Sequence, residues 1–377
     1  MKFSGISWVH DDTGFFYSGY CAPASSKDAS DFDAGTENDM SSGHRVMFHR
    51  VGTHYSEDIL IYSDPKNVTY LFSVTVSSCG QYAILSIHNS CDPSNQVHIA
   101  NLRNWDFKKT GLIFSPLFAD FRGSFSYITN ESNSFYFKTD YKAPKHKVVR
   151  IDIPKLPLQS QLLNEAPSIE GSVQSMRDII KEHHKDVLQG VSVIATDKLV
   201  TSWLSDVIAK LDLHELRNGK KIKSIDLPGP GSITALSGDK KYDDFFFSFT
   251  SYTDPGTVYR YNTNPKKGDQ MHVFFETEVP GYDKASFESK QVFYESKDGT
   301  KIPMIIICKK GKIFYEREDG ELKASRGNSE GDDSVPPLPT ILYGYGGFSI
   351  SLTPGFAVSR MLWIERFGGC YAVANLR

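Results

Sequence analysis

Ile341-Leu-Tyr-Gly-Tyr-Gly-Gly-Phe-Ser-Ile-Ser-Leu-Thr-Pro354 joins an apolar run to a cluster of glycines. This pattern predicts a buried strand that ends in a glycine-lined loop. The neighbouring Gly346 and Gly347 lack a Cβ and so let the backbone come close to another group. Tyr345 adds a hydroxyl that can donate a hydrogen bond, and a loop after an early sheet strand often forms part of an oxyanion hole in serine hydrolases. The alternative is a tight strand-to-loop turn with surface tyrosines, and the spacing alone leaves both open.

The residues after this loop predict a helix and a second strand. Ala357–Phe367 carries Val358, Met361 and Leu362 at helical spacing, and two glycines follow it as a stop signal. Cys370–Ala374 then has the composition of a strand. A strand, a loop, a helix and a strand in this order indicate an α/β unit.

A change of pattern near Glu288 separates this region from the rest of the chain. Lys301–Cys308 is apolar nearly throughout, which predicts a strand covered on both faces and paired with Gln291–Tyr294. Gly311–Val335 is charged and rich in glycine and serine, so we expect a solvent-exposed insertion. We therefore predict two domains, residues 1–287 and residues 288–377.

The first of these domains consists of repeated hairpins. Five pairs of β-branched or aromatic runs flank Gly, Asn or Asp turns, and a further strand follows each pair. The second strands of these hairpins begin near equivalent residues, spaced by 67, 53, 64 and 46 positions: Phe15, Tyr82, Phe135, Leu199 and Phe245. A four-stranded unit repeated at about this period is typical of β-propeller blades. Consecutive β-sandwich domains are the alternative, but the units are too short for them. We predict five blades.

The composition excludes several classes of partner and site. The net charge of −3 argues against nucleic acid, and no apolar run reaches the length of a membrane span. The five cysteines form no Cys-x-x-Cys pair, so we expect neither a disulfide framework nor a zinc site. The N-terminal residues do not resemble a signal peptide, and together these features predict a cytoplasmic protein.

The chemical motifs of common enzymes are also missing from this sequence. It contains no Gly-x-Ser-x-Gly nucleophile elbow, and no histidine follows His272. A complete Ser-His-Asp triad therefore cannot be built within residues 288–377. Because there is also no phosphate-binding glycine motif, we predict no nucleotide cofactor and no metal.

Three segments resemble the start of the catalytic domain of the prolyl oligopeptidase family. They are Lys297–Met304, Tyr343–Phe348 with Pro354, and Ala372–Arg377. Further matches to the propeller of that family occur in order along the chain, at Lys2–Gly5, Gly35–Glu37, Ser56–Leu60, Cys91–Pro93, Glu182–Leu188 and Phe249–Ser251. The resemblance covers nearly the whole chain, so one chance match does not account for it.

The resemblance implies a cytosolic serine peptidase that cleaves after proline in short peptides and is a monomer at full length. It also implies an α/β-hydrolase domain capped by a seven-bladed propeller. Matched by position, Tyr345 corresponds to the oxyanion-hole tyrosine and Phe348 to an aromatic residue of the substrate pocket. Phe3 and Cys91 match propeller residues that face the substrate. For Cys91, a buried small apolar residue is the alternative.

The sequence also departs from the family pattern. His88 stands where an arginine near the substrate is expected, and the Gly311–Val335 insertion is longer than the usual connection. The first blades, the nucleophile elbow, the aspartate and the histidine are missing from these residues. We therefore expect one part of a longer peptidase that is inactive by itself. The alternatives are a non-catalytic propeller that binds a partner and keeps the Tyr345 loop as a relic, and a hydrolase of the same clan with another substrate preference.

Overall fold

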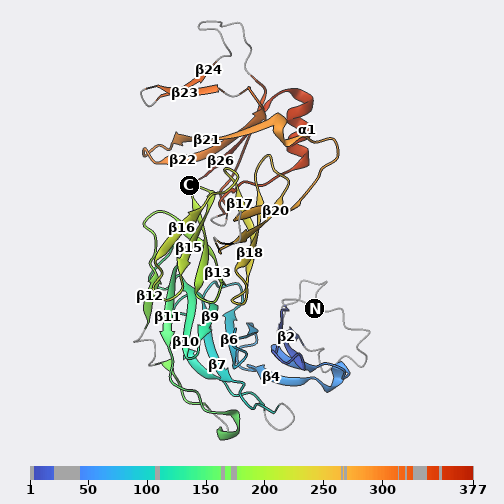
Figure 1. The fold of residues 1–377 in the computed structure, drawn as a ribbon, viewed down its shortest axis with the longest axis vertical. Helices are drawn as coiled ribbons and strands as arrows, with labels where there is room; N and C mark the ends of the chain where they lie inside the picture. The colour runs from blue at the N-terminus through green and yellow to red at the C-terminus, as the bar shows by residue number, and fades with distance from the viewer. Residues whose placement is uncertain are drawn as a thin grey trace. The chain divides into compact units, whose positions relative to one another are not determined.

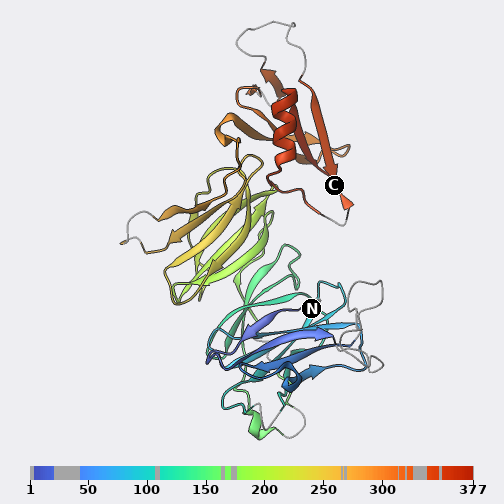
Figure 2. The same ribbon diagram turned by 90° about the vertical axis from the view of Figure 1, so that its right-hand side faces the viewer.

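The computed structural model shows a chain built almost entirely of four-stranded sheets (Figures 1 and 2). It divides into two compact units, Met1–His183 and His184–Arg377, and each is described by itself. The described residues are 4–20, 43–106, 111–162, 166–170, 176–264, 266, 270–312, 314–318, 321–325, 338–347 and 350–376.

The first unit contains three antiparallel sheets, and in each the strands lie side by side in chain order. The first sheet consists of β1 (Ile6–Trp8), β2 (Gly14–Tyr20), β3 (His44–Arg50) and β4 (Ile59–Ser63). The second consists of β5 (Tyr70–Val76), β6 (Tyr82–Asn89), β7 (Asn95–Asn101) and β8 (Ser115–Phe118). The third consists of β9 (Phe125–Glu131), β10 (Ser134–Thr139), β11 (Lys147–Asp152) and β12 (Arg177–Ile180).

Apolar layers fill the space between successive sheets of this unit. The alternation of side chains along each strand sends every second residue to one face, so both faces of a central strand carry apolar residues. Phe16 and Phe48 of the first sheet pack with Phe72 and Leu85 of the second. A second apolar cluster lies on the other face of the second sheet and includes Phe135 and Phe137 of the third sheet. In this cluster the rings of Phe118 (β8) and Phe125 (β9) stack, with their centroids 4.0 Å apart.

The second unit begins with two more antiparallel sheets of the same kind. One consists of β13 (Val187–Ile194), β14 (Lys198–Ser205), β15 (Ile208–Glu215) and β16 (Lys221–Ile225). The other consists of β17 (Ser232–Gly238), β18 (Asp244–Thr250), β19 (Thr257–Asn262) and β20 (Met271–Glu276). Phe245, Phe247 and Phe249 of β18 join Val200 and Leu211 in the core between these two sheets. The five predicted four-stranded units are thereby confirmed.

The sixth sheet differs because it is mixed. Its order is β21 (Phe287–Glu295), β22 (Lys301–Lys309), β26 (Cys370–Asn375) and β25 (Thr340–Tyr345), and β25 runs parallel to β26. The helix α1 (Val358–Phe367) connects these two strands and lies against one face of the sheet (Figure 2). It ends at Gly368, whose φ of 63° is the left-handed conformation of a C-cap glycine, as the sequence predicted.

One expectation for this region was wrong, namely that the strand before the glycine loop is buried. β25 is exposed along its whole length because it is an edge strand among the described residues, whereas the sequence predicted a buried strand. In α1 the buried residues are Met361 and Ile364, while Val358 and Leu362 are more than half exposed. The insertion contains a two-stranded hairpin, formed by β23 (Phe314–Glu318) and β24 (Glu321–Ser325).

Candidate functional site

Tyr345 is the last residue of β25 and lies directly opposite Asn375, the last residue of β26. Because these two strands are parallel, both residues lie at the carboxyl edge of the sheet. This edge is where α/β sheets commonly place their ligands. Tyr345 is 40% exposed, so the residue lies at the surface of the described sheet.

The backbone of the two glycines after β25 lies very close to neighbouring side chains. A Cβ added to Gly347 would lie 2.8 Å from the hydroxyl oxygen of Tyr345, and a Cβ added to Gly346 would lie 3.0 Å from the Cβ of Leu376. The contact at Gly347 is shorter than real Cβ atoms show, and the contact at Gly346 is tighter than most, so in both cases a neighbour would have to move. The predicted close approach is therefore present, and one of its partners is the Tyr345 ring itself.

Asn375 anchors the segment that follows this loop. Its side-chain amide donates to the carbonyl oxygen of Leu352 at 3.1 Å, and its Oδ1 accepts from the Leu352 N–H at 2.8 Å. The hydroxyl of Tyr294 donates to the backbone oxygen of Asn375 at 2.5 Å. Asn375 is only 7% exposed, so these bonds form away from bulk water. The sequence contained this residue in a matched segment but gave no reason to assign it a role.

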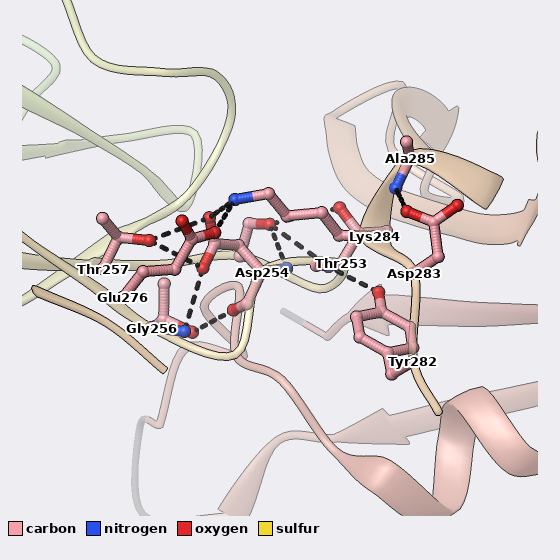
Figure 3. Close-up of polar contacts among 11 residues, drawn as sticks. Thr253, Asp254, Gly256, Thr257, Glu276, Tyr282, Asp283, Lys284 and Ala285 are labelled. Atoms are coloured by element: carbon pink, nitrogen blue, oxygen red, sulfur yellow. Dashed lines mark hydrogen bonds and ion pairs between the residues drawn. The ribbon is translucent and has the colours of Figure 1, made fainter. Parts of the chain in front are cut away.

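The segment between β20 and β21 is tied to the fifth sheet by a polar cluster (Figure 3). Asp254 accepts hydrogen bonds from the Gly256 N–H and the Thr257 hydroxyl, and the ammonium group of Lys284 lies 3.6 Å from its Oδ2. Lys284 also pairs closely with Glu276 (Figure 3). Asp254 is 9% exposed, so its charge is compensated locally by three donors rather than by water.

Three tyrosines make further contacts between the fifth sheet, the segment before β21 and the mixed sheet with its helix. The Tyr282 hydroxyl donates to the carbonyl oxygen of Thr253 at 2.7 Å, as Figure 3 shows. The guanidinium of Arg360, on α1, lies 4.8 Å from the ring centre of Tyr252 and 5.1 Å from that of Tyr371. Burial lowers the pKa of Arg360 from its usual value, and the rings compensate part of the lost hydration by cation–π attraction.

The predicted site residues fall in different parts of the chain. Tyr345 is in the second unit, and Cys91 is in the turn between β6 and β7 of the first. Cys91 is exposed, so the alternative of a buried apolar residue is wrong. Phe3 and Phe348 lie outside the described residues. His88 is at the end of β6, with its Nε2 3.2 Å from the Ser86 hydroxyl.

No group of three or more potential metal ligands occurs among the residues that the structure describes. Within the same residues, no helix has both the length and the apolar character needed to cross a membrane.

Comparison with known proteins identifies relatives along the whole chain. Residues 1–273 match the family model described as "Prolyl oligopeptidase, N-terminal beta-propeller domain". The chain is 32% identical over 380 residues to a prolyl endopeptidase of Elizabethkingia meningoseptica and 30% identical over 383 residues to one of Dictyostelium discoideum. Both alignments cover 100% of this chain and 45% of the relative. The chain thus spans less than half the length of these curated relatives.

Comparison with solved structures also identifies members of the prolyl oligopeptidase family. Prolyl oligopeptidase B from Galerina marginata, bound to a 35mer hydrolysis and macrocyclization substrate, aligns with a TM-score of 0.78 and 26% identity. This alignment covers 100% of the present chain and 46% of the fungal chain. The apo form of the same protein aligns with a TM-score of 0.76, again at 26% identity.

Proposed function

The chain belongs to the prolyl oligopeptidase family, and we propose that it forms the propeller and the first part of the catalytic domain of a serine endopeptidase that cleaves oligopeptides after proline. In this proposal residues 1–287 form the β-propeller and residues 288–377 begin an α/β-hydrolase domain. The mixed sheet and the crossover through α1 support the second assignment. The serine, aspartate and histidine of the triad come from sequence outside these 377 residues.

The observation that carries this proposal is the position of Tyr345. This exposed residue lies at the carboxyl end of a parallel strand, next to a loop whose glycines leave room for its hydroxyl. When a nucleophile attacks the peptide carbonyl, negative charge develops on the carbonyl oxygen. A phenol positioned in advance stabilises that charge by donating a hydrogen bond, without reorganisation of water.

Three further residues belong to the proposed substrate site. Phe348 contributes an aromatic wall of the substrate pocket, and Phe3 and Cys91 contact the peptide from the propeller. The exposure of the Cys91 thiol is compatible with such a contact. The proposed enzyme needs no cofactor, acts as a monomer and works in the cytoplasm.

The test is the Tyr345→Phe variant of the whole protein that carries this chain. Loss of one oxyanion donor lowers kcat by about 10²-fold or more, whereas KM for a proline-containing peptide stays nearly constant. Mass spectrometry of the products of the parent protein shows whether the cut follows proline. A parent protein that binds such peptides without cleaving them would instead support the non-catalytic propeller.

A further inference from the structure

A polar cavity lies between the second and third sheets of the first unit. Its volume is about 280 Å³, and its walls come from one face of β5, β6 and β7 and from β9 with the residue before it. The polar part of the lining consists mainly of the side chains of Ser73, Thr75, Ser86, His88, Asn95 and Ser126. None of the residues assigned above to catalysis belongs to it.

One buried side chain holds the two sheets together at this cavity. Asn95 is 2% exposed; its Oδ1 accepts from the Phe125 N–H at 2.7 Å, and its Nδ2 donates to the Phe125 carbonyl oxygen at 3.1 Å. The same Nδ2 lies 2.7 Å from the hydroxyl oxygen of Ser86, which in turn is 3.2 Å from His88. This chain of bonds crosses from β9 to β6 and preforms the cavity wall.

Three hydroxyl groups of the lining remain able to form hydrogen bonds with a ligand. Ser73 and Thr75 occupy alternate positions of β5 and therefore point to the same face, and Ser126 faces the cavity from β9. All three residues are exposed, and their hydroxyls have no hydrogen-bond partner within the described part of the chain. Each hydroxyl can both donate and accept a hydrogen bond.

The charge of the lining restricts what can bind. It contains no Asp, Glu, Lys or Arg, and its titratable groups are His88 and Tyr127. A permanently charged group placed here would lose water without gaining a permanent opposite charge, which is unfavourable. An amide presents donors together with an acceptor and carries no charge, so it matches an array of hydroxyls.

The apolar part of the lining and the volume point to the size of the ligand. Ile84, Val97 and Phe125 supply buried apolar surface beside the hydroxyls, which suits the methylene groups of a side chain. A cavity of about 280 Å³ is at the small end of ligand pockets and holds one or two residues of a peptide rather than a whole oligopeptide.

We propose that this cavity is a subsite for an uncharged, amide-bearing residue of an extended peptide, of the asparagine or glutamine type. The inference rests on the proposed function, because it assigns a remote part of the same peptide substrate to the propeller. It adds a preference that does not depend on proline: Asn or Gln side chains are accepted, and Asp or Glu side chains of nearly equal size are rejected for their charge.

The test measures peptide binding to the whole protein that carries this chain, by calorimetry at pH 7. The probe is acetyl-Gly-Asn-Gln-Gly-Gly-amide, which lacks proline and so stays intact. The matched peptide has Asp and Glu in place of Asn and Gln. We expect the acidic peptide to bind at least tenfold more weakly. Equal affinities, or no binding of either peptide, overturn the proposal.

Variants identify the cavity as the place of binding. Thr75→Val combined with Ser126→Ala removes two free hydroxyls without adding bulk, and we expect about tenfold weaker binding of the amide probe. Thr69→Val is the matched control, because Thr69 is an exposed threonine next to β5 that does not line the cavity. A double variant that melts like the parent and binds the probe equally well also overturns the proposal.

The two hypotheses fail separately in this design. If the proline-containing peptides are not cleaved but the amide probe binds as expected, the subsite stands and the peptidase assignment fails. If cleavage after proline occurs but the amide and acidic probes do not differ, the peptidase assignment stands and the subsite fails.

Discussion

The hydroxyl oxygen of Tyr345 lies 2.8 Å from the point at which Gly347 would carry a Cβ. The tyrosine and the glycine therefore act as a pair, since the ring reaches its position only because the loop backbone has no side chain there. Tyr345 also lies opposite Asn375 at the ends of two parallel strands. The position of the proposed oxyanion donor thus depends on a loop glycine as well as on the sheet.

The Gly347→Ala variant of the whole protein that carries this chain tests this pairing. The added methyl group displaces the Tyr345 hydroxyl or the loop, so we expect kcat for peptide hydrolysis to fall about tenfold or more, because small displacements of positioned groups are costly. Gly355→Ala is the control, since a Cβ at Gly355 meets nothing within 4 Å. Both variants are compared by steady-state kinetics and thermal unfolding. Equal kcat values for the two would show that the close approach has no role.

A second prediction concerns Asn375, which makes two hydrogen bonds to Leu352. Asn375→Asp keeps the acceptor for the Leu352 N–H but loses the amide donor and places a carboxylate beside a carbonyl oxygen. We expect a loss of about 1–3 kcal/mol in the free energy of unfolding, measured by urea denaturation, because a buried polar group loses its partner. Asn375→Ala should cost a similar amount or more. Unchanged unfolding midpoints would mean that this anchor does not stabilise the loop.

Lys284 provides a third prediction at the segment before β21. Lys284→Met keeps most of the aliphatic side chain but removes the cation that faces Asp254 and Glu276 (Figure 3). Asp254 keeps its bonds from Gly256 and Thr257, so we expect a loss of about 1 kcal/mol.

Lys309→Met is the matched control for that variant. Its ion pair with Glu365 is also exposed, and neither partner contacts a buried carboxylate in the described structure. We expect its free energy of unfolding to change by less than about 0.5 kcal/mol. If the two methionine variants lose the same stability, the polar cluster around Asp254 has no special contribution.

A further prediction concerns the reactivity of two cysteines towards an alkylating reagent. Burial raises the pKa of the Cys308 thiol to about 12, whereas Cys91 is exposed. At pH 8 Cys308 therefore remains protonated, and the thiolate is the reactive form. Iodoacetamide followed by peptide mass spectrometry should label Cys91 and leave Cys308 unlabelled in the native protein. Labelling of both residues at the same rate would contradict the structure.

The same pKa shift has a consequence for stability. The native state keeps the Cys308 proton above pH 9, where the unfolded chain loses it, so unfolding becomes more favourable as the pH rises from about 9 towards 12. Cys308→Ala removes this contribution. The stability of the variant should therefore fall less steeply than that of the parent in this range.

The strand content could be predicted from the sequence because it depends on local patterns. Phe15, Tyr82, Phe135, Leu199 and Phe245 all lie in, or at the start of, the second strand of a four-stranded sheet, as the hairpin spacing predicted. The end of α1 at Gly368 was equally predictable, because a C-cap glycine is a local signal.

Other features depended on neighbours that are far away in the sequence. The apolar pattern of Ile341, Leu342 and Tyr343 predicted burial, but β25 pairs on one side only and all three residues are exposed. Asn375 belongs to no recognisable sequence motif. Its role comes from two hydrogen bonds to Leu352, which is 23 residues away in the sequence. For the same reason, no sequence spacing indicated the cavity between β6 and β9.

The sequence by itself determined the repeated four-stranded units, the α/β pattern of the last residues and the resemblance that points to Tyr345. Hydrophobic alternation, turn residues and glycine stops act over a few residues, so they can be read along the chain. Only the tertiary structure decided which strand is an edge, which glycine makes room for the tyrosine and which hydroxyls meet in one cavity. These properties arise when strands from distant parts of the chain come side by side, and a linear pattern does not contain that information.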